Sequence, residues 1–279
     1  MRDIPPLSRE DYTDPQCPFC TDAYKDTPPV RMVNCERVIT KLEEYLGKNN
    51  YAQAERHLLY WLTEAVDGRD LRGQFTIRNE LIGLYRKIGN KDASLENARA
   101  ALALVDTLEI WDSPGAGTAY INTATAYKAF DMAEEALPLF EKAKELYEKH
   151  LAENDGRLGG LYNNMALALA DLARYDEAMA YYEKALSVMR QVPNGELEQA
   201  VTYLNMAEAL DARFGIEAAE QDVNVCLDRA EALLHTEHLP RDGYYAFVCE
   251  KCAPTFGYFG RFFTERELAR SAEEIYARP

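Results

Sequence analysis

Residues 175–189, YDEAMAYYEKALSVM, decide the fold. Ala178, Tyr182, Ala185 and Met189 are spaced by four, three and four residues, which brings them to one face of an α-helix. Similar spacing runs through almost the whole chain, and short runs with period-two alternation are missing. The sequence therefore predicts an all-α protein.

Segments like this one recur along the chain. Each carries a small residue at the same position of its helix, and the steps between these residues are 40, 42, 42 and 41. The small residues are Ala54, Ser94, Ala136, Ala178 and Ala219. Steps this regular are the signature of a repeat architecture, in which each pair of helices stacks on the next.

The unit at 159–193 resembles the tetratricopeptide repeat (TPR), with Ala178, Tyr182 and Ala185 at the three signature positions of its second helix. The preceding unit has Ala136, Phe140 and Ala143 at these positions. The usual repeat has about 34 residues. A step near 41 resembles the longer-helix branch found in kinesin light chains and in bacterial peptide-sensing regulators.

This resemblance implies a right-handed α-solenoid superhelix of about six TPR-like helix pairs, with each first helix on the concave side. We expect an extended, Pro-rich segment at 1–33, followed by the solenoid at 34–279. The predicted units lie near 35–68, 75–111, 117–153, 159–193, 200–237 and 241–277. The last unit lacks the signature residues, which is typical of a terminal capping repeat.

The first helices of three units share the pattern Tyr-x-Asn-x-Ala, which aligns Asn122, Asn164 and Asn205 in one column. Asn79 lies one position earlier than the column, and Asn163 lies beside it. Relatives with the longer repeat use such a column to bind the backbone of an extended peptide. An Asn carboxamide both donates and accepts, so it satisfies both backbone groups of a peptide. The alternative is that these side chains bond neighbouring helices or face water.

Charged neighbours on the same predicted face are Arg86, Lys128 and Glu208. They indicate a groove that is basic at one end and acidic at the other, which would orient a peptide. The predicted function is therefore a non-catalytic interaction module that binds a protein or an extended peptide.

Two Cys-x-x-Cys pairs, Cys17/Cys20 and Cys249/Cys252, lie near opposite ends of the chain. A redox role is disfavoured because no βαβ pattern follows Cys17. A zinc site that draws two cysteines from each pair is the second interpretation. The third is that the cysteines are reduced and packed as small hydrophobic residues.

The segment at 1–33 offers an alternative function. In one version, this segment occupies the groove in cis. In the other, it attaches the first repeat to the last, with a four-cysteine zinc site as one means of attachment, and the chain is a self-closed scaffold. Apart from this zinc, no cofactor is expected, since the sequence lacks a phosphate loop, a dinucleotide fingerprint and HExxH.

The composition restricts the classes of partner that the chain is expected to bind. With 31 basic and 47 acidic residues, the formal net charge of −16 argues against nucleic acid and anionic membranes. The amino-terminal residues lack the apolar core of a signal peptide, so a reducing cytoplasm is the expected location.

Overall fold

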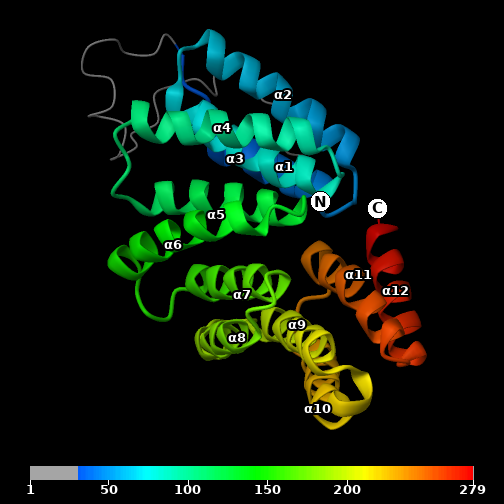
Figure 1. The fold of residues 1–279 in the computed structure, drawn as a ribbon. Helices are drawn as coiled ribbons and strands as arrows, with labels where there is room; N and C mark the ends of the chain where they lie inside the picture. The colour runs from blue at the N-terminus through cyan, green and yellow to red at the C-terminus, as the bar shows by residue number, and fades with distance from the viewer. Residues whose placement is uncertain (1–30, 279) are drawn as a thin grey trace. The chain divides into compact units, whose positions relative to one another are not determined.

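The computed structural model describes residues 31–278, and the chain forms twelve α-helices there without any strand (Figure 1). The helices are α1 (Cys35–Leu46), α2 (Tyr51–Asp67), α3 (Leu71–Lys87), α4 (Lys91–Thr107), α5 (Pro114–Ala129), α6 (Ala133–His150), α7 (Gly156–Asp171), α8 (Tyr175–Met189), α9 (Glu196–Phe214), α10 (Ile216–Leu234), α11 (Gly243–Tyr258) and α12 (Phe262–Tyr276). In chain order they make six pairs. None of these helices has the length and apolar character required to cross a bilayer.

Several helices end in the same tight turn. After α7, for example, Ala173 adopts a positive φ of 57°, and the Arg174 N–H donates to the Leu169 carbonyl at 2.9 Å. This is the Schellman arrangement, which satisfies carbonyls left free at the end of a helix. Because the turn takes only three residues, α8 begins at Tyr175 and folds back on α7.

The chain divides into two compact units, one ending at Phe130 and the other beginning at Asp131. The described part of unit 1 contains α1 to α5. Each helix packs on the next, and α3 also contacts α1 and α5. Its main core contains side chains from α1, α2 and α3, among them Val38, Leu42, Leu58, Trp61, Ile77 and Leu81.

The buried carboxylate of Asp70 joins three segments of unit 1. Its Oδ1 accepts from the Gly73 N–H at 2.8 Å, which caps the start of α3. Its Oδ2 accepts from the Val33 N–H at 2.9 Å, so the chain before α1 is attached to the turn between α2 and α3. A Cβ on Gly73 would lie 2.3 Å from Asp70 Oδ2, so a larger residue here would displace the carboxylate from these bonds.

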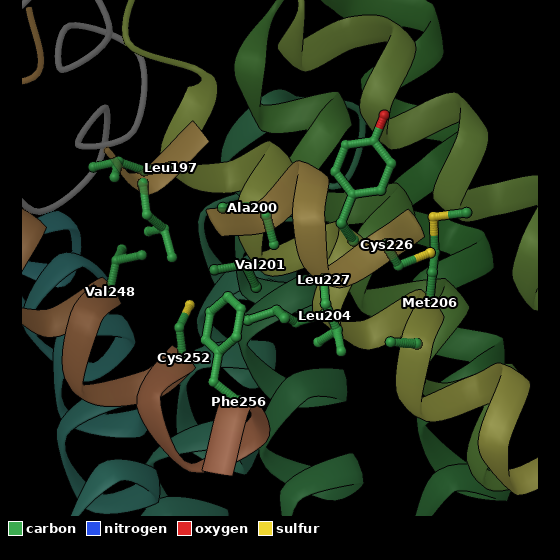
Figure 2. Packing of buried hydrophobic residues seen from close by; sticks show 14 of the residues in the cluster. Leu197, Ala200, Val201, Leu204, Met206, Cys226, Leu227, Val248, Cys252 and Phe256 are labelled. Carbon is green, nitrogen blue, oxygen red and sulfur yellow. The ribbon is translucent and has the colours of Figure 1, made fainter. Parts of the chain in front are cut away.

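Unit 2 contains α6 to α12, and one hydrophobic core extends from α7 to α12. Figure 2 shows its centre, where apolar side chains of α9 meet those of α10 and α11. The labelled residues are Leu197, Ala200, Val201, Leu204, Met206, Cys226, Leu227, Val248, Cys252 and Phe256. The first helices α7, α9 and α11 contact one another in sequence, so the pairs of this unit are stacked as repeats are.

The small residues that define the repeat are buried. Ala54, Ser94, Ala136 and Ala178 have no exposed surface, and Ala219 is 3% exposed. Close approach of paired helices requires small side chains at such positions. The prediction of an all-α fold built from TPR-like helix pairs is confirmed.

Candidate functional site

The surface of interest is the first-helix face, by which we mean the side of each unit formed by the first helices of its pairs. In unit 1 these helices are α1, α3 and α5, and in unit 2 they are α7, α9 and α11. The asparagines predicted to bind a peptide lie on these helices, so each unit is described in turn.

In unit 1, Asn79 of α3 and Asn122 of α5 form a carboxamide pair. Asn122 Nδ2 donates to Asn79 Oδ1 at 3.0 Å, and Asn79 Nδ2 donates to the Phe75 carbonyl at 2.9 Å. Asn79 is 7% exposed, whereas Asn122 is half-buried. The outer carboxamide is therefore held in place by a buried one.

In unit 2, the corresponding pair is Asn163 of α7 and Asn205 of α9. Asn205 Nδ2 donates to Asn163 Oδ1 at 3.0 Å, and the two residues are 9% and 8% exposed. As in unit 1, the accepting residue lies one position before the column of the sequence pattern, so the bond to Asn205 comes from Asn163 and not from Asn164, the column residue. Asn164 is half-buried and occupies the next position on α7.

These pairs bond neighbouring helices, as the alternative interpretation of the asparagines expected. These bonds do not use all the hydrogen-bonding groups of the carboxamides. Each carboxamide offers two N–H donors and an oxygen with two lone pairs. Among the described residues, Asn122 and Asn205 each use one donor in these bonds, and no bond is found there for the oxygen or the second N–H of either side chain.

Charge differs sharply between the first helices of the two units. The helix α3 carries four basic residues and one acidic residue, and α9 carries four acidic residues and one basic residue. Of the predicted neighbours, Arg86 is exposed at the end of α3, Lys128 is half-buried at the end of α5, and Glu208 is exposed on α9. Glu80 also lies on α3, where burial and the nearby Glu43 raise its pKa.

Hydroxyl groups of α11 orient two acidic side chains of α9. Thr255 Oγ1 donates to Glu208 at 2.7 Å, and the Tyr258 hydroxyl donates to Asp211 at 2.8 Å. The sequence contained no pattern that linked these residues, because α11 lacks the repeat signature. The terminal pair thus does more than cover the core, since it also fixes the acidic face of α9.

The cysteines of the second pair lie in the core of unit 2. Cys249 is 0% and Cys252 2% exposed, and Cys252 lies among Val201, Val248 and Phe256 (Figure 2). Burial raises the pKa of the Cys252 thiol to about 12, which favours the neutral thiol over the thiolate that zinc requires. The described residues contain no group of three or more His, Cys, Asp or Glu side chains that could hold a metal ion. Cys17 and Cys20 lie outside the described residues.

Comparison with known proteins agrees with this architecture. Residues 158–232 match the family model described as Tetratricopeptide repeat. The structure of BtubC (BKLC) from P. vanneervenii is 21% identical in sequence, covers 74% of this chain and 84% of its own, and superposes with a TM-score of 0.60. A structure of the TPR-like repeats of a putative kinesin light chain from Podosopora anserina, carrying one substitution, is 17% identical, covers 72% of this chain and 93% of its own, and has a TM-score of 0.50.

A curated relative is the Clustered mitochondria protein homolog of Coccidioides immitis (strain RS). It is 26% identical over 173 residues, which are 62% of this chain. The match spans only 12% of that protein's length. The resemblance to TPR proteins of the kinesin-light-chain type, predicted from the repeats, is confirmed by the family model and the structures.

Proposed function

We propose that this chain is a protein-interaction module that binds an extended polypeptide segment on its first-helix face. TPR repeats are interaction repeats, and the polar groups of this face suit a peptide backbone. The observation that carries the proposal is the pair Asn79–Asn122. The inner carboxamide fixes the outer one at 3.0 Å, so Asn122 is oriented before any ligand arrives.

Backbone recognition alone would be weak. A net contribution of about 0.5–1.5 kcal/mol per hydrogen bond gives little affinity from two or three carboxamides. Side-chain recognition must supply the rest, and the charges differ enough to do so. Basic residues of α3 suit acidic side chains, and acidic residues of α9 suit basic side chains.

The test begins with selection of peptides from a displayed library of random 12-residue segments by the full chain. The affinities of synthetic versions are then measured by fluorescence polarisation. We expect the double variant Asn122→Ala/Asn164→Ala to bind them several-fold more weakly, because both residues are half-buried and accessible.

Asn224→Ala is the matched control. Its half-buried carboxamide lies on α10, a second helix, where its Oδ1 accepts from Arg261 at 3.0 Å. If the control variant also lost peptide binding, the loss would reflect a general effect on the fold. Selection of no peptide, or equal affinity of the double variant and the parent chain, would refute the proposal.

A further inference from the structure

The loop before α9 and the loop before α11 enclose a pocket of about 270 Å³ in unit 2. Small-molecule sites usually have about 300–1,000 Å³, so this pocket is better matched to one side chain than to a cofactor. Its apolar wall is formed by the end of α8, the following loop and the start of α9, with Met189, Val192 and Leu197. Pro240 and Tyr244 complete the wall from the other loop and α11.

One carboxylate, that of Glu198, lines this apolar pocket from the first turn of α9. It accepts a short hydrogen bond from the Tyr244 hydroxyl. This is the one hydrogen bond of its side chain among the described residues, so its second oxygen has no hydrogen-bond donor there. Lys251 of α11 is a nearby positive charge, which partly offsets the effect of burial in raising the pKa of Glu198. Asp242, also in the lining, is already engaged, because its carboxylate accepts from the N–H groups of Tyr244 and Tyr245 at the start of α11.

We propose that this pocket binds a lysine side chain of the polypeptide partner. The four-carbon stem of lysine matches the apolar wall, and its ammonium group pairs with Glu198. Lysine suits the pocket better than arginine does, because a bidentate guanidinium needs both carboxylate oxygens and Tyr244 already occupies one. The acidic character of α9 and the net charge of −16 favour the approach of a cationic segment.

The position of the pocket links it to the first-helix face. Glu198 precedes Asn205 by seven residues, which is about two helical turns or 10.5 Å along one side of α9. A segment that contacts Asn205 would therefore need only about three extended residues to bring a lysine to the pocket. This inference rests on the proposed function and names the side chain that gives it specificity.

The experiment uses pools of acetylated and amidated nine-residue peptides, randomised except at the centre. The central residue is lysine, norleucine or glutamate, and norleucine has the shape of lysine's stem without the charge. Fluorescence polarisation with the full chain measures the affinity of each pool. We expect the lysine pool to bind about tenfold more tightly than the norleucine pool.

Glu198→Gln should bring the lysine-to-norleucine ratio close to one, since glutamine still accepts from Tyr244 but has no charge. Val192→Trp fills the pocket and should weaken the binding of both pools. Glu220→Gln, an exposed site on α10, removes one charge elsewhere in unit 2 and should leave the ratio unchanged. Thermal melting checks that each variant is folded.

The two kinds of failure are distinguishable. Equal affinity for lysine and norleucine pools, or a ratio that survives Glu198→Gln, would overturn the lysine pocket and leave peptide binding intact. Failure of all three pools to bind would count against the proposed function itself.

Discussion

The hydrogen bond between Asn163 and Asn205 makes a quantitative prediction. When Asn205 is replaced by Ala, Asn163 Oδ1 loses its donor on a residue that is only 8% exposed. Leaving a buried polar atom without a partner costs about 1–3 kcal/mol of unfolding free energy. Asn163→Ala leaves Asn205 Nδ2 without its acceptor and should cost a similar amount.

The double variant Asn163→Ala/Asn205→Ala leaves neither atom unpaired. Its loss of unfolding free energy should therefore be smaller than the sum of the single losses by about 1 kcal/mol. Urea unfolding followed by circular dichroism measures all four proteins, and equal m-values show that the comparison is valid.

Asn164 provides the control cycle. It is adjacent to Asn163, and no bond to Asn205 is found for it among the described residues. Asn164→Ala and Asn205→Ala should be additive within about 0.3–0.5 kcal/mol. If Asn163 and Asn205 are equally additive, or if Asn164 shows the coupling instead, the pairing in unit 2 is incorrect.

Three further predictions concern buried groups. Tyr182→Phe should leave the unfolding free energy unchanged or raise it by about 1 kcal/mol, because its buried hydroxyl has no partner among the described atoms, and a clear loss would contradict this. Glu80→Gln should raise the melting temperature at pH 7, because the raised pKa of Glu80 means that folding disfavours its charged form. The gain in melting temperature should vanish as the pH falls below 4.5, the ordinary pKa, where the carboxyl group is neutral in both states. A gain that persists below this pH would show that the charge of Glu80 is not its cause. Because the pKa of Cys252 is about 12, iodoacetamide at pH 8 should modify it slowly in the folded chain and readily in urea, as peptide mass spectrometry would report; equal rates would exclude burial of the thiol.

The sequence predicted the fold well because helix pairing depends on local signals. Apolar spacing determines which face of a helix is buried, and small residues mark where two helices approach. Ser94 illustrates the second signal, since its hydroxyl donates to the Ile82 carbonyl at 3.1 Å and so allows a polar residue at a fully buried anchor.

The bonds between the asparagines were harder to predict than their alignment. Asn79 and Asn163 each lie one position before the column, and each bonds a column residue of the next first helix, Asn122 or Asn205. One position rotates a side chain by about 100° around a helix, so the residue before the column is the one that meets the neighbouring first helix. A repeat motif therefore identifies equivalent positions but not which of them bond across repeats.

The same limit applies to the pocket at Glu198. Its lining comes from two loops and four helices that are separated in the chain, and no spacing in the sequence connects Val192 with Pro240 or Tyr244. Only the stacking of the last two helix pairs brings them together.

The carboxamide pairs are a poor solution for stability alone. A buried polar pair roughly breaks even with well-packed apolar side chains, and a half-satisfied one is worse than either. Both units nevertheless place such a pair between first helices, and in each the donating residue has an oxygen and an N–H that bond no other described residue. An apolar pair would hold the helices together equally well but would offer nothing to a peptide backbone. The pairs are best explained if stacking the repeats and binding a polypeptide impose their requirements on the same residues, so that the bond which sets the register of two helices also orients the groups that a partner meets.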